Sequence, residues 1–215
     1  MELYLDLISP YAYLAWHDLK AIARKHQRTV QPRPILLAAL LNHWGQRGPA
    51  EIAPKRRFIY KDVLRRAAES GLPLEGPATH PFRPLTALRV SMPEVCGDEQ
   101  ERVIDALFGA SWGGGGEIGT DEGVVRALTD AGLDGERMVA KSKTPEPKAA
   151  LRAATDRAVS AGVFGVPTVV VEGELIFGHD RLHDVRSVLE GRDTVDAEKL
   201  EIMLARPASA NRIPS

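Results

Sequence analysis

The chain has 215 residues, 44% of them hydrophobic, which is enough to bury a core in one domain with an insertion or in two small lobes. Its 28 Lys and Arg side chains nearly balance its 29 Asp and Glu side chains, so a basic nucleic-acid-binding face is not expected. The single cysteine, Cys96, excludes an internal disulfide and a C-x-x-C dithiol, and we interpret it as a packing residue.

The chain begins without a basic segment followed by an apolar one, so no secretory signal is predicted. No apolar run approaches the roughly 18 residues that a membrane helix needs. We therefore expect a cytoplasmic protein without a membrane partner, and we predict no metal site.

The N-terminal part predicts a strand, a helix and a second strand. Leu3 to Ile8 is apolar on both faces, as a central strand requires. Ser9 is a suitable N-cap and Pro10 a suitable first residue for a helix whose apolar residues recur at helical spacing as far as Ala23. Thr29 to Ile35 predicts a short or edge strand because it contains two prolines. In such a crossover unit the two strands should be parallel.

The region from residue 38 to residue 147 predicts an all-helical insertion, because it contains helical patterns but no convincing strand. Its clearest helices are expected at 54–71, 85–92 and 99–110. Asp121 is a plausible N-cap for a shorter helix that stops at Gly132. The four glycines at 113–116 predict a flexible loop, either a hinge or lid or a plain surface linker.

After the insertion the pattern is mixed again. A helix at 147–161 precedes a hairpin of the strands 168–171 and 175–177, and a helix at 181–190 follows. Without the insertion the order is β-α-β-α-β-β-α. The predicted fold class is therefore α/β, with a sheet domain at 1–37 plus 148–200, a helical insertion at 38–147 and a tail at 201–215.

Three segments are expected to meet at one end of this sheet. Ser9-Pro10-Tyr11 begins the first helix, where free N–H groups and the helix dipole favour an anion, unless Ser9 is simply the cap. A cis bond at Val166-Pro167 would expose the Val166 backbone to an extended peptide. His179-Asp180 begins the last helix, where N–H groups can hold a carboxylate and Asp180 an ammonium group, unless the pair is a solvated cap.

A fourth candidate is the basic run Lys55-Arg56-Arg57, with Arg47 upstream and Tyr60 and Asp62 beyond it. It is either a solvated helix face or a cationic wall that attracts a carboxylate-bearing substrate. His43 and His80, in loops of the insertion, are weaker candidates for the same site.

Five stretches in these segments resemble the 2-hydroxychromene-2-carboxylate isomerase and kappa-class glutathione transferase branch of the DsbA-like thioredoxin superfamily. They run in the family's order across nearly the whole chain, at 4–14 (YLDLISPYAYL), 54–57 (PKRR), 80–85 (HPFRPL), 162–168 (GVFGVPT) and 178–181 (GHDR). The resemblance implies a thioredoxin-like fold with a helical insertion. It also suggests a homodimer.

For the site, the resemblance implies that glutathione is bound. Ser9 would hydrogen-bond the glutathione sulfur, and Val166 would pair with the cysteinyl backbone beside a cis Pro167. His179 and Asp180 would lie at the γ-glutamyl end, although some relatives have serine in place of His179.

The resemblance also assigns residues around the substrate, a small aromatic carboxylate. Tyr11, Lys55, Arg56 and Arg83 would contact it, although relatives commonly have asparagine or a similar polar residue at the place of Arg83. Gln46 would belong to the glutathione site, nearest to an asparagine that many relatives have.

The reaction implied by the resemblance interconverts 2-hydroxychromene-2-carboxylate and trans-o-hydroxybenzylidenepyruvate, or a related aromatic acid, in aromatic catabolism. A thiolate that adds reversibly to the conjugated alkene permits rotation, and glutathione would supply this sulfur because the chain has no suitable cysteine. Lys55 or Arg83 would hold the substrate carboxylate and the developing enolate. Two alternatives stay open: a kappa-like glutathione transferase, and a non-catalytic module that binds peptides at Val166-Pro167.

Overall fold

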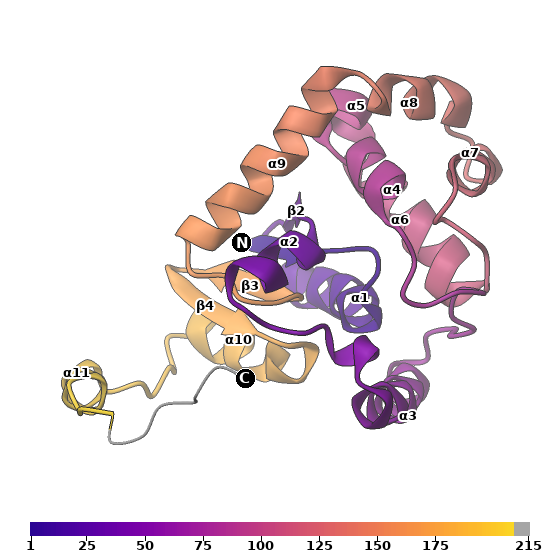
Figure 1. The fold of residues 1–215 in the computed structure, drawn as a ribbon. Helices are drawn as coiled ribbons and strands as arrows, with labels where there is room; N and C mark the ends of the chain where they lie inside the picture. The colour runs from indigo at the N-terminus through magenta and orange to yellow at the C-terminus, as the bar shows by residue number, and fades with distance from the viewer. Residues whose placement is uncertain (209–215) are drawn as a thin grey trace.

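A mixed four-stranded sheet lies at the centre of the fold, and the computed structural model describes residues 1–208 around it (Figure 1). Its strands are β1 (Glu2–Leu5), β2 (Gln31–Pro34), β3 (Thr168–Val171) and β4 (Glu174–Phe177), in the spatial order β2-β1-β3-β4. β1 is parallel to β2 and antiparallel to β3, and β3 and β4 form an antiparallel hairpin. The two ends of the chain thus build one sheet, which confirms the predicted α/β class.

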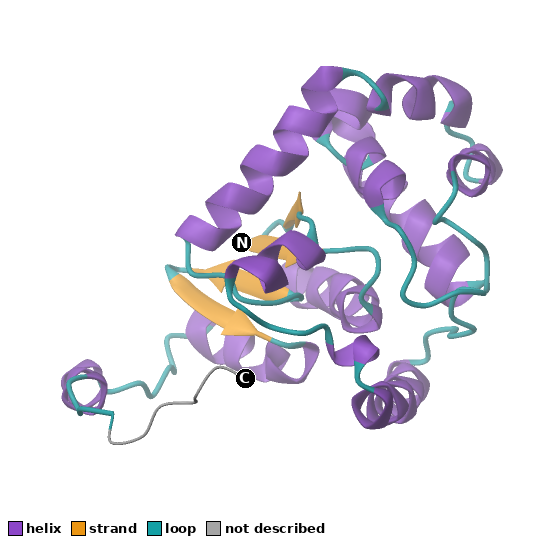
Figure 2. Ribbon diagram, in the orientation of Figure 1, coloured by secondary structure: helices purple, strands orange, loops and turns teal. Residues whose placement is uncertain are grey.

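Helices cover both faces of this sheet (Figure 2). α1 (Pro10–Lys25) and α10 (Leu182–Leu189) pack together on one face, and α9 (Pro145–Ser160) crosses the other beside α2 (Leu37–His43). The other helices are α3 (Ala53–Ser70), α4 (Leu85–Val90), α5 (Pro93–Cys96), α6 (Gln100–Phe108), α7 (Asp121–Asp130), α8 (Gly135–Ser142) and α11 (Ala197–Leu204). Short helical turns lie at Pro49–Glu51, Gly97–Glu99, Gly109–Gly113 and His179–Arg181. Between β2 and α9 the described chain contains no strand, as predicted.

One hydrophobic core extends from the sheet into the helical region. Leu3 and Leu5 of the central strand are fully buried, and α1 buries Trp16 and Leu19 against them. Trp16 Nε1 donates a hydrogen bond to Asp105 of α6 (2.6 Å). Because α1 packs against the sheet and also hydrogen-bonds α6, it fixes the helical region relative to the sheet.

Several predicted boundaries are wrong, among them the start of α9, which is Pro145 and not residue 147. β1 ends at Leu5 and not at Ile8, because the Asp6 side chain accepts the Ile8 amide (3.1 Å) and turns the chain. β2 begins at Gln31 rather than at residue 29. Thr120, and not Asp121, is the N-cap of α7, since its hydroxyl accepts the Gly123 amide (3.1 Å).

The run of glycines at 113–116 is tied to neighbouring backbone. The Trp112 carbonyl accepts the amides of Glu75 and Gly76 (2.9 and 3.0 Å), and the Gly116 amide donates to the Ala110 carbonyl (2.7 Å). These bonds anchor both ends of the predicted flexible loop to the segments beside it.

The predicted domain limits, 1–37 plus 148–200 and 38–147, stay predictions. Of the predicted tail, residues 201–204 end α11, while residues 209–215 lie outside the described residues. Within residues 1–208, no helix combines the length and the apolar character needed to cross a membrane.

Thr155 joins α9 to the start of α2. Its buried hydroxyl accepts the Leu36 amide (3.1 Å) and donates to the Leu151 carbonyl (2.9 Å). Thr155→Val keeps the shape but leaves a buried N–H without a partner, so it should lower the free energy of unfolding by about 1–3 kcal/mol in urea titrations. Ser160→Ala removes an exposed hydroxyl of the same helix and should change it by less than about 0.5 kcal/mol. Equal losses for both variants would contradict this role.

Candidate functional site

The site is built around the turn that joins β1 to α1, residues 6–9, called here the Ser9 turn. As predicted, Ser9 is the N-cap of α1 and Pro10 its first residue; the Ser9 hydroxyl oxygen accepts the Ala12 amide (3.2 Å). The hydroxyl proton is thereby left to donate elsewhere. Among the described residues none accepts the Tyr11 amide, so the N-terminus of this 16-residue helix offers a backbone donor.

Asp6 holds the Ser9 turn from inside. Its carboxylate accepts the amides of Ile8 (3.1 Å) and Leu37 (2.8 Å), and its carbonyl accepts the Ser9 amide (3.0 Å). The side chain is 1% exposed, and burial raises its pKa to about 7 although both backbone donors act to lower it. A carboxyl group that titrates near neutral pH therefore lies three residues before Ser9.

Two aromatic side chains from the helical region hold the outer side of the same turn. Trp112 Nε1 donates to the Leu7 carbonyl (2.9 Å), and His80 Nε2 donates to the Ile8 carbonyl (3.1 Å). The other His80 nitrogen accepts the Tyr60 hydroxyl (2.9 Å), and burial lowers the His80 pKa, so the imidazole is neutral. The Leu7 and Ile8 carbonyls of the turn are thus paired with side chains of the helical region.

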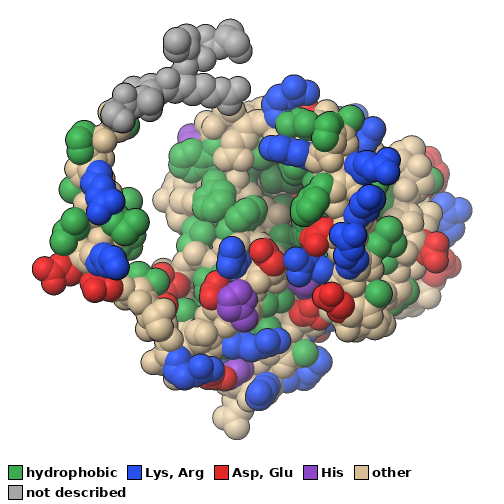
Figure 3. Space-filling view, turned by 90° about the horizontal axis from the view of Figure 1, so that it is seen from below, with side chains coloured by type: hydrophobic (Ala, Val, Ile, Leu, Met, Phe, Trp, Pro, Cys, Tyr) green, Lys and Arg blue, Asp and Glu red, His purple; other side chains and the backbone are tan. Residues whose placement is uncertain are grey.

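A cavity of about 1120 Å³ opens beside the Ser9 turn. Its walls come from the Ser9 turn, the start of α1, α2, residues 46–51, the start of α3, residues 80–84 and the segment before β3. In the space-filling view from below, the hollow is lined by hydrophobic side chains and Lys and Arg side chains lie on its rim (Figure 3). Ile8, Phe58, Phe82 and Phe164 are among the apolar lining residues. Such walls suit an aromatic ligand with a charged group.

Val166 faces this cavity from the side opposite the helical region. The Val166–Pro167 peptide bond is cis, as predicted, and among the described residues nothing hydrogen-bonds the Val166 amide or carbonyl. Phe177 lies against Gly165, where an added Cβ would come within 2.6 Å of the ring. A larger residue at position 165 would require the Phe177 ring to move. The unpaired backbone of Val166 at the cavity wall can pair with an extended peptide.

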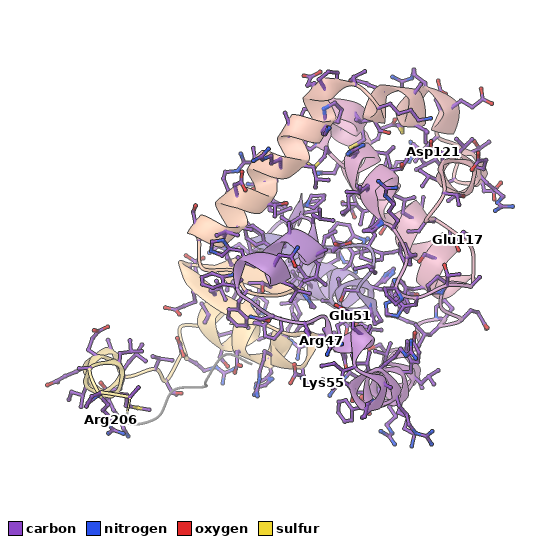
Figure 4. All side chains as sticks on the ribbon, viewed as in Figure 1. Arg47, Glu51, Lys55, Glu117, Asp121 and Arg206 are labelled. Atoms are coloured by element: carbon purple, nitrogen blue, oxygen red, sulfur yellow. The ribbon has the colours of Figure 1, made fainter. Side chains whose placement is uncertain are left out.

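Cationic side chains line the cavity where residues 46–51 lead into α3. Arg47 and Lys55 both border it, and neither forms an ion pair with a described residue. Glu51 lies beside them, and its carboxylate accepts the Gly48 amide (2.8 Å) (Figure 4). The two cations therefore remain available to an anionic ligand.

Half of the residues proposed for the site border the cavity. They are Ser9, Tyr11, Gln46, Lys55 and Val166. Arg56 and Arg83 are exposed and do not border it, and Pro167 is buried behind Val166.

His179 and Asp180 also lie outside the cavity wall. His179 Nε2 hydrogen-bonds Asp18 of α1 (2.7 Å), and this imidazole is only 9% exposed. Asp180 is exposed beside Arg181. His179 therefore joins the turn before α10 to α1.

Tyr11 borders the cavity, but its hydroxyl donates to Asp62 (2.8 Å), which also accepts Arg66 Nε (2.8 Å). Burial, the hydrogen bond to Asp62 and the nearby charges of Asp62 and Asp180 raise the Tyr11 pKa. Burial alone would raise the Asp62 pKa, but the donors Arg66 and Tyr11 hold it below its usual value. The phenol therefore stays protonated and fixes the start of α1 to α3.

Sequence reasoning missed Asp6 and Trp112 and ranked His80 low, whereas it named Arg47 with the basic run. An acidic residue inside an otherwise apolar strand pattern was the available signal for Asp6. Trp112 and His80 carry no local signal, because their partners are backbone carbonyls more than 70 residues away. Within residues 1–208 no three His, Cys, Asp or Glu side chains are grouped closely enough to hold a metal ion.

Comparison with known proteins places the chain in a family. The profile of the DSBA-like thioredoxin domain matches residues 1–190. The chain belongs to this family. The fold is similar to that of a solved 2-hydroxychromene-2-carboxylate isomerase, with a TM-score of 0.79. The two sequences are 23% identical, and the superposition covers 95% of this chain and 98% of that one.

Two curated relatives of this DSBA-like protein span most of its length. A 2-hydroxychromene-2-carboxylate isomerase of Sphingobium xenophagum is 28% identical over 191 residues, 88% of this chain and 97% of its own. Glutathione S-transferase kappa 1 of Rattus norvegicus is 27% identical over 200 residues, 85% of this chain and 87% of its own. The chain is thus similar to enzymes of both kinds named in the resemblance.

The buried Asp6 carboxyl predicts a pH effect on stability. Its folded pKa of about 7 lies above the ordinary value of 3.8, so the folded state binds the extra proton between these values. Asp6 therefore contributes stability below about pH 4 that is lost as pH rises through 7. Urea titrations at pH 5 and pH 8 should show that Asp6→Asn removes part of the wild-type decline in unfolding free energy. An identical decline in both proteins would contradict the raised pKa.

Proposed function

We propose that this protein is a glutathione-dependent cis–trans isomerase that interconverts 2-hydroxychromene-2-carboxylate and trans-o-hydroxybenzylidenepyruvate, or a related aromatic acid. The observation that carries the proposal is the position of Ser9, a hydroxyl at the N-terminus of α1 that borders the same cavity as the unpaired Val166 backbone. The similarity to the Sphingobium isomerase over nearly its whole length supports this choice.

The residues present fit glutathione. The Val166 amide and carbonyl suit the peptide backbone of a tripeptide, and the Ser9 hydroxyl and the Tyr11 amide are donors suited to a sulfur anion. The dipole of α1 adds about 0.3–1 kcal/mol of stabilisation for a negative charge at this end. The only cysteine, Cys96, is buried, and burial raises the pKa of its thiol to about 12, so it is not a reactive sulfur for this site.

Other lining residues of the cavity fit the aromatic acid. Phe58, Phe82 and Phe164 supply apolar walls, while Arg47 and Lys55 attract the carboxylate. Since neither cation is paired within the described chain, binding the acid does not require breaking an ion pair first. This division into apolar walls and two cations is the basis for the proposed substrate class.

Glutathione, when bound, supplies a thiolate that adds reversibly to a conjugated double bond and so lowers the barrier to rotation. Ser9 and the Tyr11 amide would keep that sulfur ionised by donating hydrogen bonds to it. Lys55 and Arg47 would stabilise the negative charge that develops on the carbonyl side of the substrate.

The second candidate is glutathione transfer to an electrophile, which the similarity to the rat kappa-class enzyme favours. The two reactions differ in stoichiometry, because an isomerase returns glutathione and a transferase consumes it. Free thiol measured before and after complete conversion of the aromatic acid therefore separates them. Unchanged thiol supports the isomerase, and a loss equal to the product formed supports the transferase.

Ser9→Ala tests the role of the hydroxyl. Loss of a hydrogen bond to a charged sulfur costs about 1.5–3 kcal/mol, so kcat/KM at saturating glutathione should fall roughly ten- to hundredfold. Thr120→Ala is the matched control, because it also removes an N-cap hydroxyl but lies on α7. Both variants should lose about 0.5–2 kcal/mol of stability, and only Ser9→Ala should lose activity.

Two outcomes would overturn this assignment. Full turnover by Ser9→Ala would remove Ser9 from the reaction. Calorimetry that detects no heat when glutathione is added to the wild-type protein would favour a non-catalytic binding module.

Lys55→Met tests the cationic wall. Removing this charge should raise KM for the aromatic acid roughly tenfold, the effect of losing about 1.4 kcal/mol of binding, and should leave the affinity for a neutral aromatic analogue unchanged. Arg152→Met, on the exposed side of α9, is the control for loss of one positive charge. Equal KM values for both variants and the wild type would show that Lys55 does not contact the substrate.

A further inference from the structure

α11 is an amphipathic helix that extends away from the body of the protein. Every residue from Gly191 to Ala208 is exposed, and α11 stands clear of the sheet domain in two views (Figures 1 and 3). Leu200, Met203 and Leu204 follow one another at helical spacing and are 42%, 52% and 67% exposed. Val195 and Ile202 add further exposed apolar surface. We call residues 193–204 the arm.

α3 carries a second uncovered apolar surface. It packs on the body through one narrow stripe, Ile59, Val63 and Ala67. Leu64, on its outer side, is 56% exposed, and Tyr60 is 38% exposed. We call this outer side, with the recess beside it, the α3 face.

The recess gives the α3 face a socket for apolar side chains. Its volume is about 300 Å³, and Tyr60, Leu64, Leu74 and Trp112 are among its lining residues. It takes one or two aliphatic side chains of the size of leucine or methionine. It has no cation in its lining and therefore does not suit the carboxylates proposed for the larger cavity.

The arm and the α3 face have opposite charge. The arm carries four acidic residues and one basic residue: Asp193, Asp196, Glu198, Glu201 and Lys199. α3 carries six basic residues and two acidic ones: Lys55, Arg56, Arg57, Lys61, Arg65, Arg66, Asp62 and Glu69. Arg57 and Lys61 lie within one helical turn of Tyr60 and Leu64, so basic side chains flank the apolar surface. An acidic amphipathic helix complements this arrangement in both charge and polarity.

The two surfaces belong to opposite sides of one chain. α3 and α11 lie on either side of the sheet domain, with α10 between them (Figure 1). A second copy can offer its α3 face to the arm of the first and receive the reverse contact. Such a reciprocal pair closes with two-fold symmetry and leaves neither apolar surface open. The acidic charge of the arm disfavours the alternative of an anionic lipid surface.

We propose that the arm of one copy docks on the α3 face of a second copy, with Leu200, Met203 or Leu204 in the recess. The homodimer is then held by exchanged C-terminal helices. Because α3 also carries Lys55 and Phe58 to the larger cavity, the partner's arm lies on the helix that forms one wall of the proposed active site.

Charge reversal tests this contact in the full chain. Sedimentation equilibrium of the wild type should give the mass of two chains. The arm variant E198K/E201K and the α3-face variant R57E/K61E should each raise the dimer dissociation constant at least tenfold. The protein that carries all four substitutions restores opposite charges across the contact and should recover the dimer, which also shows that the reversed side chains do not prevent folding.

Other outcomes would overturn the proposal. The first is a wild-type protein with the mass of one chain. The second is a dimer whose dissociation constant is unaffected by either pair of charge reversals. The third is a protein with all four substitutions that fails to recover the dimer. If the wild-type protein has the mass of one chain and co-sediments with neutral phosphatidylcholine vesicles, the arm would be assigned to a lipid surface instead.

Discussion

The site depends on how the Ser9 turn is held. A turn between a strand and a helix leaves its carbonyls and amides without ladder partners, and these must be satisfied inside the protein. On the inner side, the Asp6 carboxylate accepts the Ile8 and Leu37 amides. On the outer side, Trp112 and His80 donate to the Leu7 and Ile8 carbonyls. Because these partners come from separate parts of the chain, the position of Ser9 is fixed only when the sheet and the helical region are packed together.

This arrangement gives the helical region a direct part in the proposed chemistry. The connection from β1 to α1 and the segment before β3 supply Ser9 and Val166, whose donor groups suit a thiol peptide. Residues 46–51 supply Arg47, and the start of α3 supplies Lys55 and the apolar Phe58. In this DSBA-like fold, the cavity therefore has a cationic and aromatic side as well as the side formed by Ser9 and Val166. The family assignment alone does not fix the reaction, since function belongs to the site and not to the fold.

Local patterns predicted the fold well where one segment determines its own structure. Ser9 followed by Pro10 marked the start of α1, and β-branched residues around Glu172-Gly173 marked the hairpin. The cis Val166–Pro167 bond needed the family resemblance, since its local base rate is low. Contacts between distant segments could not be read in this way. Trp112 bonds a carbonyl 105 residues away, and the exposure of α11 depends on what lies around it rather than on its composition.

The pKa of the thiol of bound glutathione tests the central claim most directly. It is measured by the ultraviolet absorbance of the thiolate as pH is varied, with wild-type protein and with Trp112→Phe, which keeps an aromatic ring but cannot donate to Leu7. A thiol held by a fixed Ser9 turn should titrate at least one pH unit below free glutathione in the wild type. In Trp112→Phe its pKa should move back toward the free value. A wild-type complex that titrates like free glutathione would contradict the account.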